Sequence, residues 1–322
     1  MAFETVAVFG ADGQIGQHIL EKLSHNFKAN FKVLAFIHPE DQPSCSRNYH
    51  KSIIKQFDLN ELSREGLAKD LQGVDAVISA LGGKALDAQP TIQDAAADAG
   101  VKRFYPSEYG MHHIYQKPGD LRGHLHPIWN QKHKLNERAV LHPAVQSGMM
   151  SYTVIGCGDF YNRDREPVWC SWMREDVEEY ILHIIGDPET KADFTNLDDF
   201  AAYLVETLLH PAKSENQYLN FVSDTISHMG IAESLRKHTG RTVKIDYYPV
   251  EKMHEVAADP TKAPQELRQS PFPPDFWFMV KGMQGEGRSI RPRGQVHNYL
   301  FPDVQPTTFD KYFQQKFKGE QT

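Results

Sequence analysis

The fold is decided by the stretch TVAVFGADGQIG, residues 5–16. A run of four apolar residues, 6–9, precedes a glycine-rich turn, and an amphipathic segment that starts at Gln14 follows it. This order of apolar run, glycine turn and helical period is typical of the first βα unit of a nucleotide-binding sheet. The sequence therefore predicts a dinucleotide site at residues 10–16.

The glycines of this turn have different expected roles. Gly10 would make the tight turn, Gly13 would let a diphosphate approach the backbone, and Gly16 would let the helix pack on the strand. Backbone N–H groups at the start of the helix, those of Gln14 and Ile15, would bind the diphosphate, because the helix dipole presents about half a positive charge there. The alternative is an ordinary glycine-rich βα turn without a ligand.

Short apolar runs and longer amphipathic segments alternate from residue 4 to about residue 110. This pattern predicts strands at residues 5–9, 32–37, 52–57, 76–79 and 103–106, and helices at residues 14–23, 62–71 and 91–99. We expect an α/β protein, namely a Rossmann-type doubly wound parallel sheet with a smaller C-terminal substrate-binding domain. Residues 1–156 would form the dinucleotide-binding domain, and residues 157–322 would be mainly the substrate-binding domain, with later segments returning to the sheet.

Weaker signals organise the rest of the chain. Residues 111–122 are expected to form a long surface loop before a helix at 128–141. A strand at 152–155 would be broken by Gly156, Gly158 and Asp159, and residues 200–209 would form a helix. Residues 270–279, rich in proline and aromatics, are expected to form either a lid or the core at the edge of the second domain.

Composition excludes several classes of protein. The 322 residues carry a formal net charge of -7 without a polybasic run, so nucleic acid is not an expected partner. The three cysteines form no C-x-x-C pair, which argues against structural zinc and favours a reducing compartment. Neither an export signal nor a membrane span is apparent. We expect a cytoplasmic monomer or homodimer that binds a small molecule.

The residues after the second strand decide which dinucleotide binds. An acidic residue there would select the free 2′-hydroxyl of NADH, but the strand is followed by His38. The basic residues Arg47 and Lys51 come later and favour NADPH. They could equally be solvated loop charges, so NADH stays the less favoured alternative. Asp12 would oppose a bound diphosphate unless its side chain caps the helix.

Residues that directly follow the strands are expected to face the ligand, because the carboxyl ends of parallel strands form the binding edge. For the cofactor these are Ala80, Leu81, Gly82, Ser107, Gly158 and Phe160. For the substrate they are Tyr109, Phe160 and Tyr161, with plain core packing as the alternative.

The helix near residue 130 carries Lys132 and Lys134, and either could point back toward the cofactor. A lysine can transfer a proton near neutral pH only if burial or a neighbouring cation lowers its pKa. Five histidines, His112, His113, His124, His126 and His133, lie in the same region. They show no metal-ligand spacing, so no metal site is expected.

Several segments together resemble the NmrA-like and isoflavone reductase-like branch of the atypical short-chain dehydrogenases, in particular its members from fungal secondary metabolism. They are the turn at 10–16, VDAVIS at 74–79 followed by Gln89, VKRFYPSEYG at 101–110, SYTV at 151–154 with GDF at 158–160, and LFPDV at 300–304. The resemblance spans nearly the whole chain, and residues 101–110 are its most specific part.

This resemblance implies an NADPH-dependent reductase of a hydrophobic aromatic or alkaloid-like metabolite, acting on a C=O, C=N or conjugated C=C bond. The family's catalytic lysine begins a K-x-x-x-R segment, which Lys134 and Arg138 match, so the resemblance selects Lys134 as catalytic and as a cofactor contact. The family's arginine after the second strand is His38 here. Two alternatives stay open: an NADP(H)-sensing regulator without turnover, and an enzyme whose bound cofactor assists a cyclisation or rearrangement.

Overall fold

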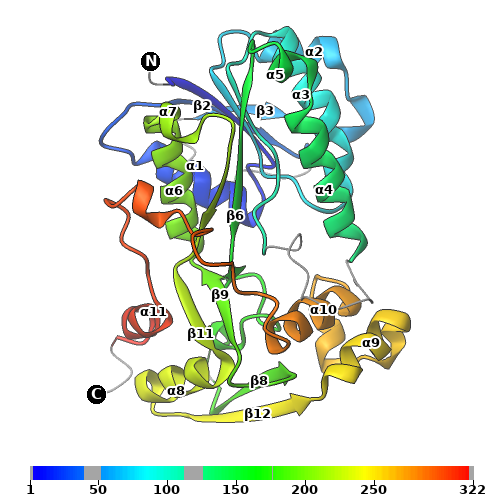
Figure 1. Ribbon diagram of the computed structural model, residues 1–322, viewed down its shortest axis with the longest axis vertical. Coiled ribbons are helices and arrows are strands. Elements are labelled where there is room, and N and C mark those ends of the chain that lie inside the picture. Colours follow the sequence, from blue (N-terminus) through cyan, green and yellow to red (C-terminus); the bar gives the residue numbers. More distant parts are fainter. Residues whose placement is uncertain (1–2, 40–51, 112–125, 176, 319–322) are drawn as a thin grey trace.

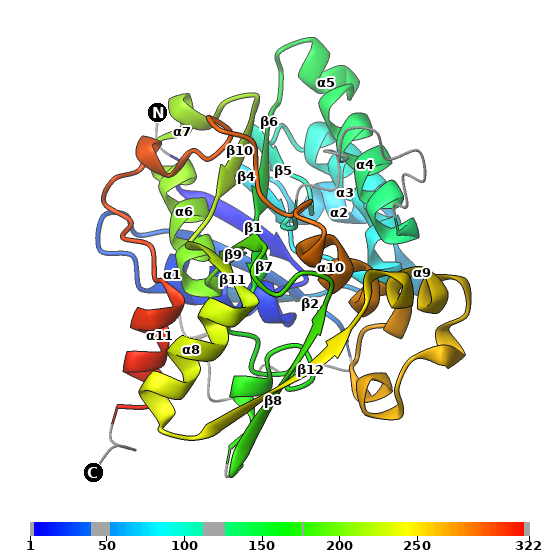
Figure 2. The same ribbon diagram turned by 60° about the horizontal axis from the view of Figure 1, so that its bottom comes forward.

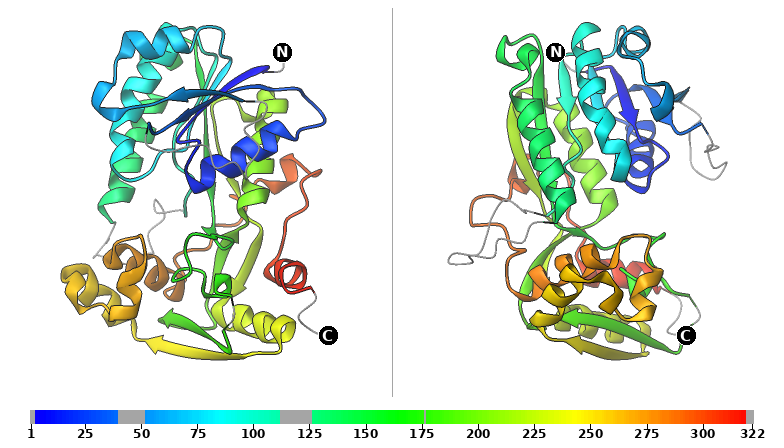
Figure 3. Two further views of the ribbon diagram at one scale, coloured as in Figure 1. Left: turned by 180° about the vertical axis from the view of Figure 1, so that it is seen from behind. Right: turned by 90° about the vertical axis from the view of Figure 1, so that its right-hand side faces the viewer.

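The structure is a computed structural model that describes residues 3–39, 52–111, 126–175 and 177–318. Figures 1 and 3 show two parts stacked along the long axis, with the large sheet and its helices in the upper part and smaller sheets and helices in the lower part. Among the described residues, no helix combines the length and the apolar character that crossing a membrane requires.

The upper part is built on a seven-stranded sheet whose order is β10-β6-β5-β4-β1-β2-β3. All of its neighbouring strands are parallel. The strands are β1 (Thr5–Phe9), β2 (Lys32–Ile37), β3 (Ser52–Gln56), β4 (Ala76–Ser79), β5 (Arg103–Tyr105), β6 (Ser151–Cys157) and β10 (Gln217–Phe221). The order 3-2-1-4-5-6 with its reversal between β1 and β4 is that of a Rossmann sheet, which confirms the expected fold.

Helices cover both faces of this sheet, each over its own apolar core. One face carries α1 (Gln14–Ser24) and α6 (Leu197–Leu209), with the short α7 (Pro211–Ser214) after it. The other carries α2 (Arg64–Asp70), α3 (Gln89–Asp98), α4 (Pro127–Val140) and α5 (Pro143–Gln146). Strands β1, β2 and β4 are largely buried on both faces, which explains why they read as continuous apolar runs, whereas the edge strand β3 leaves Ile53 and Ile54 exposed.

The lower part has two small sheets packed around a third apolar core. Their order is β11-β9-β7 and β12-β8, from β7 (Asp159–Phe160), β8 (Glu179–Ile185), β9 (Lys191–Thr195), β11 (Asp224–Ser227) and β12 (Thr242–Tyr248). The helices are α8 (His228–Thr239), α9 (Val250–Ala258), α10 (Pro274–Gly285) and α11 (Phe309–Lys316). Figure 2 shows α8 beside α11, and β8 beside β12.

The chain crosses between the two parts more than once. After β9, helix α6 and strand β10 return to the upper sheet, where Gln217 pairs with Thr153. After α10, residues near 297 return to β10 through the His297 N–H, which donates to the Asn220 carbonyl oxygen at 2.8 Å. The boundary at residue 156 stays a prediction, but β10 shows that the upper sheet needs residues well beyond it.

Two expectations about the second half are corrected. Gly156 does not break the sixth strand, because β6 continues to Cys157. Glycine is needed there for close packing, since a side chain at 156 would overlap those of Asn220 and Arg291. Asp159 does not end strand structure either, since it begins β7. The aromatic segment near 275 forms α10, which starts at Pro274, with Trp277 buried in the core and Phe276 partly exposed, and its role as a lid stays a prediction.

Candidate functional site

The turn between β1 and α1 has the backbone that its glycines predict. Gly10 has a φ of 72°, and the N–H groups of Gly10 and Ala11 both donate to the Phe36 carbonyl oxygen at 3.1 Å. A Cβ atom on Gly10 would lie 2.9 Å from the Ala80 carbonyl oxygen. The position therefore requires glycine for both its dihedral angle and the closeness of β4.

Helix α1 begins directly above this turn. Gly13 is its N-cap and, as a glycine, supplies no side-chain cap; a capping role of Asp12 stays a prediction. A Cβ atom on Gly16 would overlap the Gly10 carbonyl oxygen. The first N–H groups of a helix have no intrahelical partner. Those of Gln14 and Ile15 thus lie at a turn without obstructing side chains, which is the geometry that a diphosphate needs.

A segment far along the chain, residues 163–166, reaches this turn and is called the strap here. The Gln14 Nε2 atom donates to Asp164 Oδ1 at 2.8 Å. Arg165 donates from Nη2 to Gln17 Oε1 at 2.8 Å, and its Nη1 lies 3.5 Å from the Asp12 carbonyl oxygen. A guanidinium and a carboxylate are thereby held beside the first turn of α1.

The edge beside the turn is formed by the ends of β4 and β5. Ser107 connects them, because its Oγ donates to the Leu81 carbonyl oxygen at 2.6 Å and its N–H donates to Gln89 Oε1 at 2.8 Å. Ala80 joins β1 through its N–H, which donates to the Phe9 carbonyl oxygen at 2.8 Å. Gly82, which follows, starts a short 3-10 helix. The structure thus brings Ala80, Leu81, Gly82 and Ser107 to the same edge as Gly10.

The two candidate lysines lie on different faces of α4. Lys132 Nζ donates to the Glu108 carbonyl oxygen at 2.6 Å, directly after β5. Burial lowers the pKa of Lys132, with Arg163 acting in the same direction and Glu108 opposing it. Lys134 is exposed. Of the two lysines, only Lys132 reaches the edge of the sheet, and the catalytic assignment of Lys134 stays a prediction that this geometry does not support.

Beyond Lys132, an aromatic cluster joins the two parts of the molecule. We define it as Trp129 of α4, Trp169, Phe272 and Phe276. Ring centroids lie 5.7 Å apart between Trp129 and Phe276 and 5.1 Å apart between Trp169 and Phe272. His126 Nε2 and Asp275 Oδ2, 3.2 Å apart, join α4 to α10 beside it. The cluster gives this side of the site flat apolar walls.

Arg163 is the cation of the aromatic cluster. Its guanidinium carbon lies 4.8 Å from the ring centroid of Trp169, 5.4 Å from that of Phe272 and 5.5 Å from that of Phe160. Its Nε donates to the Phe160 carbonyl oxygen at 3.2 Å. The side chain is 15% exposed, and its Nη2 lies 3.5 Å from Asp159 Oδ1, so its charge is held by the rings and by this buried carboxylate.

A buried ion pair anchors α10 behind this cluster. Asp159 Oδ2 accepts from Lys281 Nζ at 3.0 Å and from Gln284 Nε2 at 2.8 Å, and Trp169 Nε1 donates to the same carboxylate at 3.0 Å. Burial alone would raise the pKa of Asp159, but Lys281 and Arg163 together with these hydrogen bonds bring it below its usual value. The carboxylate is therefore ionised and holds Trp169 in place.

The three residues expected to line the substrate pocket are packed in cores. Tyr109 stacks edge-on against Phe200 at 4.9 Å and has a φ of 39°, which is rare outside glycine. The ring centroids of Phe160 and Phe200 lie 5.3 Å apart. The ring centroids of Tyr161 and Phe309 of α11 lie 4.2 Å apart, and the Tyr161 hydroxyl donates a hydrogen bond to the Thr307 carbonyl oxygen. These are the contacts of structural residues, and a substrate contact for them stays a prediction.

The remaining expected residues are distributed as follows. His38 lies exposed after β2, while Arg47 and Lys51 lie outside the described residues, as do His112, His113 and His124. Gly158 is held by strand packing, because its N–H donates to Thr195 Oγ1 at 2.8 Å and a side chain would overlap the Asp193 backbone.

One set of three potential metal ligands, His18, Glu21 and Asp198, occurs in the described part of the chain. It lies between α1 and α6. His126 instead faces Asp275, and His133 is exposed.

Sequence reasoning missed the strap, Arg163 and the ion pair of Asp159 with Lys281. Their signals are weak, since Arg163 and Arg165 are two arginines in a segment without periodicity, and Lys281 follows an aromatic run. Nothing in the sequence indicates that residue 164 meets residue 14.

Three comparisons place this geometry among known proteins. The model of the NmrA-like family matches residues 3–313. The chain is 26% identical over 322 residues to isoflavone reductase homolog IRL of Zea mays, covering 95% of this chain and 96% of that one. It is 26% identical over 255 residues to oxidoreductase aprR of Aspergillus flavus, covering 79% and 80%.

Among solved structures, it resembles the binary complex of leucoanthocyanidin reductase and NADPH from Vitis vinifera. The TM-score is 0.73 at 19% identity, and the match covers 98% of this chain and 99% of that one.

Proposed function

We propose, from the premise that this chain belongs to the NmrA-like family, that it is an NADPH-dependent reductase of a small hydrophobic aromatic metabolite. The names of its relatives support this proposal, since they include an isoflavone reductase homolog, an oxidoreductase and a reductase solved with NADPH. The observation that carries it is the position of Lys132, whose Nζ meets the Glu108 carbonyl oxygen at the same sheet edge as the glycine turn.

The turn accepts a dinucleotide on its own geometry. Gly10 and Gly16 leave no room for side chains, and the N-cap Gly13 has no side chain that could occupy the N–H groups at the start of α1. Gln14 and Ile15 would hold the diphosphate through their N–H groups, Gly13 would let it approach, and the Arg165 guanidinium would add a positive charge. His38, Arg47 and Lys51 follow β2, where the adenosine ribose would lie, and we propose NADPH ahead of NADH.

When bound, the nicotinamide cofactor supplies the hydride for the reduction. Lys132 would hold a proton at Nζ and donate it to the substrate atom on which negative charge develops. Its lowered pKa suits this role, because a lysine at its ordinary pKa of 10.5 gives up its proton reluctantly at neutral pH. The Glu108 carbonyl orients the Nζ atom between transfers.

The aromatic cluster would bind the substrate body. Trp169 and Phe272 present flat apolar surfaces, and the Arg163 guanidinium between them suits an electron-rich ring or an oxygen substituent. The bond reduced, whether C=O, C=N or C=C, and the aromatic or alkaloid-like skeleton are part of this proposal. The ion pair of Asp159 with Lys281 fixes this surface from behind.

The test is direct. The purified chain is titrated with NADPH and NADH by calorimetry, and NADPH oxidation is then followed spectroscopically against a panel of aromatic metabolites. We expect tighter binding of NADPH and turnover with at least one aromatic substrate. Products made with deuterated NADPH must carry the label. Equal binding of oxidised and reduced cofactor without turnover would support the sensor alternative, and an unlabelled cyclised product would support the cyclase.

A further inference from the structure

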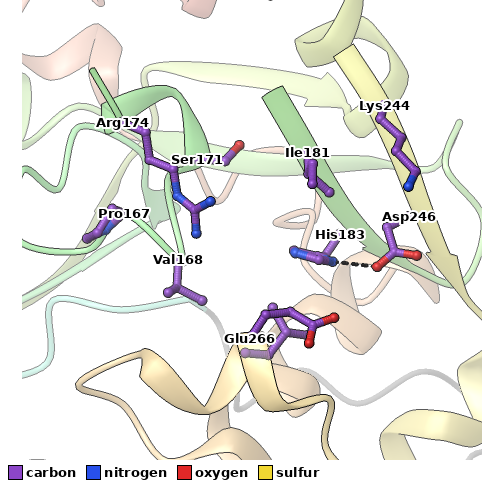
Figure 4. A pocket seen from close by; sticks show the side chains of 10 residues that line it. Pro167, Val168, Ser171, Arg174, Ile181, His183, Lys244, Asp246 and Glu266 are labelled. Carbon is purple, nitrogen blue, oxygen red and sulfur yellow. Dashed lines mark hydrogen bonds and ion pairs between the residues drawn. The ribbon is translucent and has the colours of Figure 1, made fainter. Parts of the chain in front are cut away.

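A second cavity lies in the lower part of the molecule, away from the glycine turn. It has a volume of about 490 Å³ and lies between residues 167–174, strands β8 and β12, and the 3-10 helix Gln265–Gln269. This size is within the range of about 300–1,000 Å³ that is usual for small-molecule sites. Figure 4 shows its polar side chains, which come from residues 167–174, from β8, from β12 and from the 3-10 helix, and which converge on one space.

One wall of the cavity holds a histidine fixed by a carboxylate. His183 Nδ1 lies 2.9 Å from Asp246 Oδ2, which also accepts from the Tyr248 hydroxyl at 2.7 Å. Burial lowers the pKa of His183 more than Asp246 raises it, so the ring is neutral at neutral pH. Nδ1 then carries the proton that it donates to Asp246, and Nε2 has a free lone pair. Figure 4 shows this second nitrogen directed away from Asp246, into the cavity.

The opposite wall holds a cation. Figure 4 shows the Arg174 guanidinium directed into the space between Val168 and His183. No ion pair joins Arg174 to another residue of the described part of the chain. Glu266 lies below His183, on the side away from Arg174. A negative charge is thus favoured beside Arg174. Near His183, Asp246 and Glu266 disfavour a second one, although Lys244 of β12 also lines the cavity and offsets part of their charge.

The surface between these two polar groups is apolar. Val168, Ile181 and Leu267 line it, and Val168 and Leu267 are buried. A rigid flat ligand bridges two such groups at less entropic cost than a flexible chain, because fewer rotations are frozen on binding. The cavity therefore has a hydrogen-bond acceptor at one wall, an anion site at the opposite wall and an apolar surface between them.

We propose that this cavity binds a small aromatic hydroxy acid, whose hydroxyl donates to His183 Nε2 and whose carboxylate accepts from the Arg174 guanidinium. The site is separate from the proposed reductase site. Trp169, whose ring belongs to the aromatic cluster there, directs its Nε1 to Asp159, whereas its neighbour Val168 faces the cavity. The proposal stands whether or not the chain reduces a substrate.

The probe is 4-hydroxycinnamate, titrated into the full chain and followed by ligand-observed NMR and calorimetry. Two analogues each remove one interaction: the methyl ester removes the charge, and 4-methoxycinnamate removes the hydroxyl donor. We expect wild-type protein to bind 4-hydroxycinnamate about tenfold more tightly than either analogue, since a hydrogen bond to a charged or buried polar group has about this effect.

Variants assign the two interactions. In Arg174→Gln, 4-hydroxycinnamate should bind about tenfold more weakly, and the preference for acid over ester should vanish. In His183→Phe, which keeps a ring in place, the preference for hydroxyl over methoxyl should vanish. Arg293→Gln, at an exposed arginine elsewhere, is the matched control and should bind as wild type does. Circular dichroism checks that each variant is folded.

Three results would overturn the proposal. The first is the absence of binding to wild-type protein at millimolar concentration, and the second is unchanged affinity in folded Arg174→Gln. The third is binding that Phe276→Ala abolishes and Arg174→Gln leaves intact, because this would locate the ligand at the aromatic cluster. If His183→Phe fails to fold, the Arg174→Gln comparison of acid and ester still decides.

Discussion

Lys132 and Glu108 are joined by a hydrogen bond in which the lysine Nζ donates to the backbone carbonyl oxygen of the glutamate at 2.6 Å. The acceptor lies directly after β5, and the donor lies on α4, so the bond fixes the ammonium group at the carboxyl edge of the sheet. Asn136, one turn further along α4, bonds the Glu108 side chain. Helix α4 is therefore held to this edge at two points.

Replacing Lys132 by Met should reduce kcat by about a hundredfold or more, because general acids typically contribute factors of this order. Cofactor affinity should change little. The matched variant Lys134→Met, on the exposed face of the same helix, should keep nearly wild-type kcat. Steady-state kinetics with the best substrate of the panel provide the measurement. A larger loss in Lys134→Met than in Lys132→Met would return the catalytic role to Lys134.

The pH profile of kcat tests the same assignment. Burial lowers the pKa of Lys132, and the proton-donating form is lost as pH rises through that pKa. The rate should therefore fall on the alkaline side at a pH below the usual lysine value of about 10.4. Lys134→Met should show the same alkaline fall in rate as wild type. A profile that stays flat up to the ordinary lysine range would contradict proton donation by Lys132.

Arg165→Ala should weaken NADPH binding about tenfold, because it removes a charged donor from beside the diphosphate turn. Asp164→Asn should instead strengthen NADPH binding, since it removes the negative charge of the carboxylate that accepts from Gln14. Calorimetric titration measures both. The control is Arg293→Gln, which should not change the affinity. Equal effects of the two strap variants in the same direction would mean that the strap acts by shape rather than by charge.

Asp159→Asn should destabilise the protein by about 3–5 kcal/mol, because it leaves Lys281 buried without an anion. Asp70→Asn is the matched control. Asp70 pairs with Lys55 at the surface, so its loss should cost about 1 kcal/mol or less. Urea unfolding followed by tryptophan fluorescence measures both. A small effect of Asp159→Asn would show that Lys281 is neutral or has another anion.

Glu166 of the strap should make stability depend on pH. Burial raises the pKa of Glu166 to about 7, compared with 4.5 when it is exposed. The folded state then binds a proton that the unfolded state has lost, so this stabilisation is present at low pH and disappears as pH rises from about 5 through 7. In Glu166→Gln, the melting temperature should fall less between pH 5 and pH 8 than in wild type. Parallel curves would rule out a buried, protonated Glu166.

The sequence predicts the sheet far better than the site. The strands at β1, β2 and β4 are predicted to the residue, because apolar runs bounded by turns directly record burial on both faces. Helix α10 is not predicted, because the prolines and aromatic residues at its start resemble a loop. Pro273 is its N-cap and Pro274 is its first residue, where proline is tolerated.

The choice between Lys132 and Lys134 shows why the site is harder. Side chains two positions apart on a helix, such as Lys132 and Lys134, point in directions that differ by about 200°, so one faces the sheet when the other faces solvent. The motif that selects Lys134 contains no information on how α4 is rotated. That rotation is set by contacts of the helix with other segments, such as the bond of Asn136 to Glu108. Long-range contacts of this kind, like Gln14 with Asp164, have no local signature.

Because β10 comes late in the chain, it determines when the upper sheet is complete during synthesis and which truncated fragments can fold. During synthesis, β6 stays an open edge until residues 217–221 have left the ribosome, so the sheet is completed only after much of the lower part has been translated. An exposed strand edge of this kind pairs readily with other chains. A fragment ending near residue 156 should therefore aggregate, whereas one extended through the β10 strand should gain solubility, and limited expression trials of the two lengths would reveal the difference.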